Sequence, residues 1–131
     1  MLYSYTIITP ANTQATAKKI TPLKLCRGVL HKIYIIFPPG PQGYLHLQIS
    51  HSAHQIFPTN AEENFALDSA IIESPEHYEL NQPPFNLTAQ TWNTDDTLEH
   101  RVIVIVGILE KKYIVPVLPS WIDRLKFLIG A

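Results

Sequence analysis

The sequence predicts an all-β domain: an antiparallel β-sandwich, jelly-roll-like, followed by a short C-terminal amphipathic helix. Short runs of β-branched and aromatic residues recur along the chain and are separated by turn residues. Eleven prolines and five glycines divide the apolar residues, 46% of the sequence, into short pieces. A chain of 131 residues has the length of one domain. We therefore expect a single unit, with strands and loops over 1–119 and the helix over 120–130.

The first half of the chain holds the clearest strand patterns. Segment 2–9 is rich in tyrosine, isoleucine and threonine, and 14–20 is a weaker candidate that ends before Thr21-Pro22. Segment 28–37 is a strong strand that ends at a stiff, proline-rich loop. Alternation within it places on one face Val29, His31, Ile33, Ile35 and Phe37. Segment 44–51 also alternates, with Leu45, Leu47 and Ile49 expected inward and His46, Gln48 and Ser50 outward.

The second half is expected to add shorter strands and one long one. The short candidates span 55–57, 70–73, 78–80 and 85–92. A loop of turn residues, 93–97, then leads to the longest apolar run, 102–109. This run does not alternate between apolar and polar residues, so we expect protein to cover both of its faces.

The last residues differ in their pattern. Ser120 can cap a helix that Gly130 would end. The positions that follow the helical period and form one apolar face are Trp121, Leu125, Leu128 and Ile129. Such a helix must dock on its own sandwich or on a neighbouring subunit. These four residues, together with Val104 and Val106 of the apolar run, are the predicted interface.

Composition favours a protein that works in an assembly. Charged residues make up 16% of the sequence, against roughly 25% in an ordinary soluble domain. Large permanent interfaces tolerate such apolar exteriors because a neighbour covers them. The net charge of −1 predicts no general attraction to nucleic acid or to anionic lipid. We expect a homo-oligomer whose partners include copies of itself.

Targeting signals and an internal disulfide are not expected. The first residues, 1–6, contain no basic residue before an apolar run, unlike a signal peptide. The apolar end, 121–131, is interrupted by charges and is too short to span a bilayer. Cys26 is the only cysteine. These features predict a cytoplasmic location.

No motif for catalysis stands out, and we expect no enzyme activity, metal or cofactor. The sequence holds no Gly-x-Ser-x-Gly turn and no phosphate-binding glycine loop. His46, His51 and His54 are the densest group of metal-ligating residues, but strand parity places the first two on opposite faces. A cupin would need a second histidine two residues after the first, where this chain has Gln48. A metal-dependent, cupin-like enzyme is the third of our hypotheses.

One segment carries a family resemblance. Residues 83–109, PPFNLTAQTWNTDDTLEHRVIVIVGIL, are similar to a pattern in small β-sandwich virion proteins of tailed phages. In that pattern a proline-led strand reaches an Asn-x-Asp-Asp turn, and a histidine precedes a long apolar strand. The matching positions are Pro84, Asn93, Asp95, Asp96 and His100, with 102–106 as the strand. The resemblance covers about a fifth of the chain. It implies a cement, decoration, minor capsid or tail component that has no catalytic residues.

Two main hypotheses therefore follow. The first is a non-enzymatic structural subunit that assembles with itself or binds a capsid lattice. The second is a carbohydrate- or receptor-binding module with a ligand surface of Tyr44, Trp92, Asp95 and Asp96. For the fold, an immunoglobulin-type sandwich is the main rival, although its usual cysteine pair is missing.

Overall fold

The computed structural model describes residues 1–110, which form eight β-strands and, within that range, no helix. The strands are β1 (Leu2–Thr9), β2 (Lys19–Lys24), β3 (Gly28–Phe37), β4 (Leu45–His51), β5 (His54–Phe57), β6 (Ala70–Leu80), β7 (Asn86–Asn93) and β8 (His100–Leu109). The all-β prediction is confirmed for these residues. The predicted helix over 120–130 lies outside them. In the described part of the chain, no helix has the length and hydropathy needed to cross a membrane.

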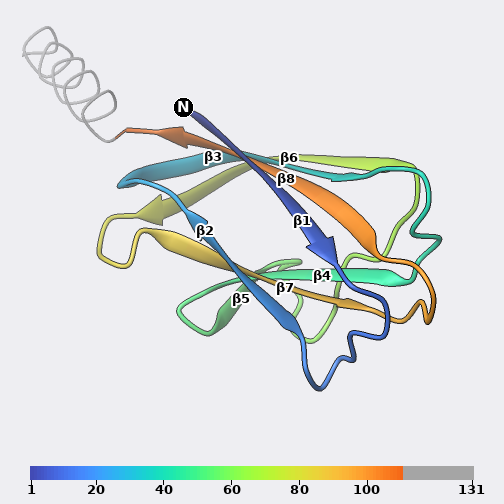
Figure 1. Ribbon diagram of the computed structural model, residues 1–131. Helices are drawn as coiled ribbons and strands as arrows, with labels where there is room; N and C mark the ends of the chain where they lie inside the picture. The colour runs from blue at the N-terminus through green and yellow to red at the C-terminus, as the bar shows by residue number, and fades with distance from the viewer. Residues whose placement is uncertain (111–131) are drawn as a thin grey trace, which may run out of the picture.

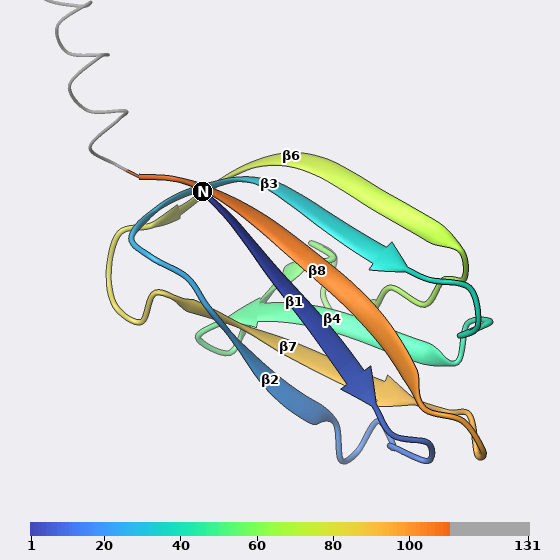
Figure 2. The ribbon, with the colours of Figure 1, turned by 45° about the horizontal axis from the view of Figure 1, so that its top comes forward.

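The strands form two four-stranded antiparallel sheets that face each other in a sandwich-like arrangement (Figure 1). One sheet has the order β1-β8-β3-β6 and the other the order β2-β7-β4-β5. The antiparallel pairs are nested: β1 with β8, β2 with β7, β3 with β6, and β4 with β5. Consecutive strands β1 and β2 therefore belong to different sheets, as do β3 and β4 (Figure 2).

The core lies between the two sheets and is filled from both. Because side chains alternate along a strand, every second residue of β8 points inward. Those residues are fully buried: Val102, Val104, Val106 and Ile108. From the other sheet come Leu23, Leu87, Ala89 and the three residues of 44–51 that were expected to face inward. The predicted orientation of Leu45, Leu47 and Ile49 is confirmed, each with 0% exposure.

Two strands differ from the predictions because each contains a proline. β2 runs from Lys19 to Lys24 and includes Pro22, so the predicted strand 14–20 was misplaced. β6 is one continuous strand through Pro75, where two short strands were expected. Both are edge strands of their sheets. One side of an edge strand has no partner strand, so a proline there, which has no N–H, need not remove a hydrogen bond from the sheet. Each strand therefore continues through its proline.

β3 contains a bulge that changes the predicted faces. The register with both neighbours shifts between Leu30 and Lys32, leaving His31 as the extra residue. Val29 and Leu30 are consequently both buried. The prediction that His31 shares one face with Val29 and Ile33 was wrong for this reason. Opposite the bulge, a Cβ on Gly107 would lie 2.8 Å from His31 Nε2, so glycine makes room for the imidazole ring.

Candidate interaction surface

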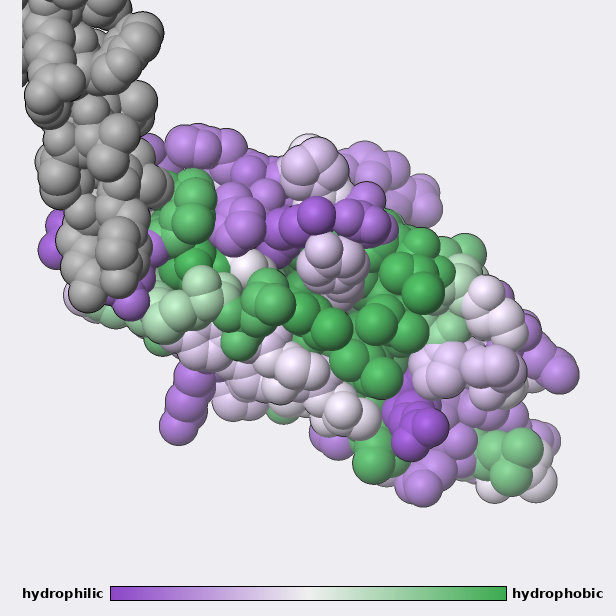
Figure 3. Space-filling view, turned by 90° about the horizontal axis from the view of Figure 1, so that it is seen from above, coloured by the Kyte–Doolittle hydropathy of each residue, from purple (hydrophilic) through white to green (hydrophobic). Residues whose placement is uncertain are grey.

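The outer face of the β1-β8-β3-β6 sheet carries apolar side chains in register. Strand pairing aligns one row across the sheet: Thr6, Ile103, Ile36 and Ile71. The next row is Ser4, Ile105, Tyr34 and Glu73. We call the four isoleucines Ile36, Ile71, Ile103 and Ile105, with Ile8 on β1, the apolar face. Ile71 is 68% exposed and Ile8 is 45% exposed, while the other three are half-buried. Figure 3 looks onto this side of the molecule and shows hydrophobic surface running across it.

One ion pair lies at the side of the apolar face. Lys32 Nζ is 2.9 Å from Glu73 Oε1 and 5.3 Å from the centre of the Tyr34 ring. The Glu73 carboxylate is the main reason that the pKa of Lys32 is raised above its ordinary value. An exposed pair of this kind contributes little to stability. It does cancel the charge on both residues, so that this part of the face carries no net charge.

The structure separates the predicted interface residues of β8 from this surface. Val104 and Val106 are 0% exposed and point into the core. The outward positions of the same strand are Ile103 and Ile105. Strand alternation predicts that every second residue of this run faces out. Because the run contains no polar residue, the sequence does not show which of the two sets that is. Trp121, Leu125, Leu128 and Ile129 lie outside the described residues.

The outer face of the β2-β7-β4-β5 sheet is polar and partly covered by the chain itself. The ring of His46 stacks on Trp92 with centroids 4.9 Å apart, and Lys18 Nζ lies 4.6 Å from the Trp92 ring centre. Loop 58–66 folds along this sheet, where Phe65 pairs with Leu47 through two backbone hydrogen bonds. Trp92 is 7% exposed beneath the side chains of His46 and Lys18. It is a packed residue of this face.

Loop 93–99, which contains the other predicted ligand residues, is held by Asp95. Its carboxylate accepts hydrogen bonds from the Thr97 N–H at 2.9 Å, the Leu98 N–H at 3.3 Å and His100 Nε2 at 2.8 Å. The Thr97 N–H and then His100 lower the pKa of Asp95 to about 2. Asp96 is exposed, and its carboxylate accepts only from the Thr97 hydroxyl, at 3.2 Å, while its carbonyl accepts from Asn12 Nδ2 at 3.3 Å.

The predicted ligand surface is therefore brought together in part. Tyr44 lies beside this loop, because the Thr94 N–H donates to the Tyr44 carbonyl at 3.0 Å. Tyr44 and Asp96 are exposed, whereas Trp92 is packed and the Asp95 carboxylate is fully engaged. The surface that remains is small.

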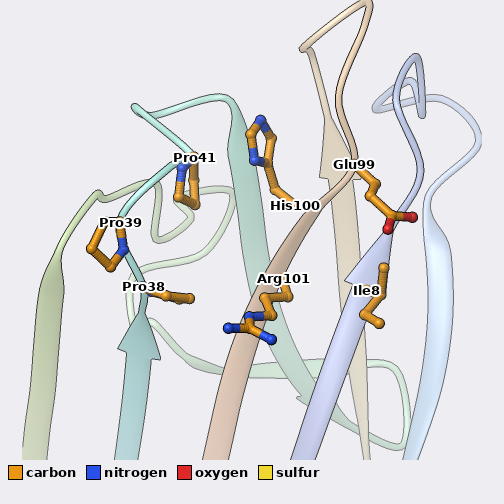
Figure 4. A pocket seen from close by; sticks show the side chains of 7 residues that line it. All are labelled: Ile8, Pro38, Pro39, Pro41, Glu99, His100 and Arg101. Atoms are coloured by element: carbon orange, nitrogen blue, oxygen red, sulfur yellow. The ribbon is translucent and has the colours of Figure 1, made fainter.

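A pocket of about 250 Å³ lies where β3 ends and β8 begins (Figure 4). It is lined by Ile8, Pro38, Pro39, Pro41, Glu99, His100 and Arg101. Asp68 holds the proline-rich wall, since its Oδ1 accepts from the Gly40 N–H at 2.8 Å and the Gln42 N–H at 3.1 Å. The same bonds lower the pKa of Asp68. The His100 ring is committed to Asp95, and the lining holds no hydroxyl or thiol.

A second pocket, of about 230 Å³, lies between β5 and β6 at the side edge of the two sheets. Its lining mixes apolar and hydrogen-bonding side chains: His54, Gln55, Ile56, Phe57, Thr59, Glu76, His77 and Tyr78. The Tyr78 hydroxyl is 2.7 Å from His51 Nδ1, and the Ser74 hydroxyl donates to Glu76 Oε1 at 2.8 Å. Among residues 1–110, no three His, Cys, Asp or Glu side chains converge as metal ligands.

No protein-family model matches this chain, and no curated protein sequence is significantly similar to it.

Proposed function

We propose that the chain is a non-enzymatic structural subunit that assembles through the outer face of its β1-β8-β3-β6 sheet. Within this class we place it among capsid-associated virion proteins of the decoration, cement or minor capsid type. Copies of the chain, or a capsid lattice together with them, would be its partners. The observation that carries the proposal is the apolar face, with Ile71 68% exposed beside three further isoleucines.

The strand pairing supports a jelly roll as the fold of this subunit. The four nested antiparallel pairs describe one long two-stranded ribbon folded over into two sheets. An immunoglobulin sandwich would instead place the first two strands in the same sheet. Jelly rolls are frequent among viral capsid domains and lectins, and cupins share the fold. The fold thus agrees with the resemblance of 83–109 to virion proteins, although fold alone does not define a function.

The chemistry of the two outer faces supports assembly through one of them. Exposed apolar patches of contiguous residues mark interaction sites on otherwise soluble proteins. The apolar face spans four strands, and the ion pair at its side cancels its own charge, but Arg101 on β8, which pairs with Ile8 of the face, is exposed. A partner that covers Ile8 must therefore leave Arg101 in water or supply a carboxylate for it. The opposite sheet presents His46, Gln48 and Lys18 in polar contacts instead.

Light scattering with one matched pair of variants tests the proposal. Ile71→Lys adds a charge to the apolar face on edge strand β6, and Ile20→Lys adds the same charge to the outer face of edge strand β2. Both isoleucines are largely exposed, at 68% and 57%, so neither change should unfold the subunit. We expect the wild type and Ile20→Lys to form the same oligomer and Ile71→Lys to be monomeric. A wild type that is monomeric at every concentration, or equal masses for both variants, would overturn the proposal.

The pocket between β5 and β6 favours a second candidate, a carbohydrate- or receptor-binding module. Sugar rings bind where an apolar surface lies beside several hydrogen-bonding groups, and the pocket combines Ile56 and Phe57 with His54, Thr59 and Tyr78. A glycan array probed with the wild type and with His54→Ala tests it. Binding that His54→Ala abolishes supports the module, and an array without hits contradicts it.

A further inference from the structure

The two sheets have four edge strands, and three of them carry features that discourage pairing with another chain. β6 contains Pro75 and three glutamates, and β2 contains Pro22 between Lys19 and Lys24. β5 has only four residues. Prolines, charges and short length are the devices by which natural sheets protect their edges. β1 is the exception, because its eight residues, LYSYTIIT, include no charge and no proline.

The backbone groups on the free side of β1 can be assigned from its register with β8. The Ile108 N–H donates to the Met1 carbonyl, and antiparallel pairing alternates hydrogen-bonded with non-hydrogen-bonded pairs. Tyr3, Tyr5, Ile7 and Thr9 therefore bond to β8. The N–H and C=O groups that point away from β8 belong to Leu2, Ser4, Thr6 and Ile8. Of these, the Ile8 carbonyl accepts a hydrogen bond from Lys19 Nζ.

Three residues thus remain with open backbone groups, Leu2, Ser4 and Thr6, and all three are exposed. Their spacing of two residues is that of one side of a β-ladder, and Ser4 lies at its centre. An antiparallel copy of the same strand, turned about an axis through Ser4, would present the same three residues to them. Every open donor and acceptor in the set would then meet a partner.

We propose that β1 pairs with β1 of a second copy about a twofold axis through Ser4, joining two β1-β8-β3-β6 sheets into one eight-stranded sheet. This inference builds on the proposed function, a subunit that assembles with copies of itself, and adds the edge of β1 as a contact beside the apolar face. Ser4 lies opposite Ser4 of the second copy, and Leu2 lies opposite its Thr6. The contact is the same patch on both subunits, as a twofold axis requires.

The side chains of β1 suit this pairing on both faces of the joined sheet. On the inner side, Tyr3 lies opposite Tyr5 of the second copy, and cross-strand aromatic pairs are favourable. On the outer side, Leu2 and Ile8 extend the apolar face across the junction, at 70% and 45% exposure before pairing. β1 carries no charged side chain, so no like charges meet across the axis.

Cysteine cross-linking tests the pairing and its register. In a Cys26→Ser background, Ser4→Cys places two thiols across the axis, where hydrogen-bonded partners have Cα atoms about 5.5 Å apart. That spacing lies within the range for a disulfide. Thr6→Cys is the matched control, because its copy lies four residues away along the strand, about 14 Å. We expect Ser4→Cys to give a covalent dimer on mild oxidation and Thr6→Cys to remain uncross-linked on a non-reducing gel. Equal cross-linking of both variants, or none with Ser4→Cys, would overturn the inference.

A charge at the axis gives a second readout that needs no covalent bond. Ser4→Lys places two lysines directly opposite each other, and His77→Lys adds the same charge to exposed edge strand β6. We expect Ser4→Lys to weaken dimer formation about tenfold or more, and His77→Lys to leave it unchanged. Circular dichroism melts verify that both variants fold. Dimers of wild-type strength in Ser4→Lys would contradict the pairing.

The two sets of variants separate this inference from the proposed function. If Ile71→Lys disrupts assembly while the Ser4 variants behave as the wild type, subunits meet through the apolar face and the β1 pairing is wrong. If the Ser4 variants disrupt a dimer that Ile71→Lys leaves intact, β1 pairing holds and assembly through the face is wrong. If neither set changes the mass, both proposals fail.

Discussion

The two outer faces of this sandwich are built on the same alternation and differ in what lies on them. On the β2-β7-β4-β5 sheet, the outward positions of β4 and β7 are polar or aromatic, and loop 58–66 packs along this sheet. On the β1-β8-β3-β6 sheet, the five isoleucines of the apolar face lie outward among polar residues such as Thr6, Glu73 and Arg101. The first face is completed within the chain. The second offers apolar area that a partner can cover, which is why we assign assembly to it.

Side-chain hydrogen bonds tie loop 58–66 to the polar face. Gln48 Nε2 donates to the Glu63 carbonyl at 2.9 Å, and His46 Nδ1 lies 2.7 Å from Asn64 Oδ1. Gln55 Nε2 donates to three carbonyls of the same loop region, those of Pro58, Asn60 and Glu63. These contacts satisfy polar groups of the outward residues of this sheet and hold loop 58–66 against it.

The largest expected effect comes from removing the aromatic centre of the polar face. Trp92→Ala deletes a side chain that is 7% exposed and contacts His46 and Lys18. We expect the free energy of unfolding to fall by about 3 kcal/mol, at the lower end of values for buried tryptophan. Tyr34→Ala, on the apolar face, should cost about 1 kcal/mol or less because its ring is only half-buried. Urea unfolding of both variants measures the difference, and equal losses would mean that Trp92 is not packed beneath His46 and Lys18.

A smaller effect is expected at loop 93–99, where the chain passes from the polar-faced sheet to the apolar-faced one. The pKa of Asp95 is about 2 in the folded protein, below its ordinary value of 3.8, because the Thr97 N–H and His100 bind the carboxylate. A lowered pKa means that this carboxylate stabilises the fold above about pH 4. That contribution is lost as the pH falls through 2.

Asp95→Asn removes this ionisation and keeps the shape of the side chain. We expect the variant to be less stable than the wild type at pH 6, and the difference to shrink as the pH is lowered from 4 to 2. Asp96→Asn is the control, since its carboxylate is exposed and bonds only to the Thr97 hydroxyl. A difference between Asp95→Asn and wild type that stays constant over this pH range would show that the charge is not responsible.

Much of this architecture could be predicted from the sequence, because most strands show the alternation that burial imposes. Segment 44–51 is the clearest example, with its three apolar residues fully buried as expected. Pro22 and Pro75 misled the prediction, since a proline in a central strand and one in an edge strand look alike until the sheet order is known.

The candidate surface was harder to predict than the fold. In 102–109 the apolar residues continue without interruption, so the outward Ile103 and Ile105 cannot be told from the inward Val104 and Val106 by composition. Trp92 is covered by His46 and Lys18, which lie far from it in sequence and carry no signal of where they will pack. The open edge of β1 emerges only when the strand order places β1 at the end of its sheet.

The smallest expected effect concerns Gly107, which borders the apolar face. Gly107→Ala would place a Cβ 2.8 Å from His31 Nε2 and 3.2 Å from Cε1, so the imidazole ring must move. Because that ring is a movable side chain in a bulge, we expect a loss of only about 1 kcal/mol. The double variant His31→Ala/Gly107→Ala should recover most of this loss relative to His31→Ala alone, since the ring that blocks the methyl group is gone. A double-mutant cycle from urea unfolding measures the coupling. Additive losses would show that the bulge in β3, rather than the His31 ring, requires glycine at this position.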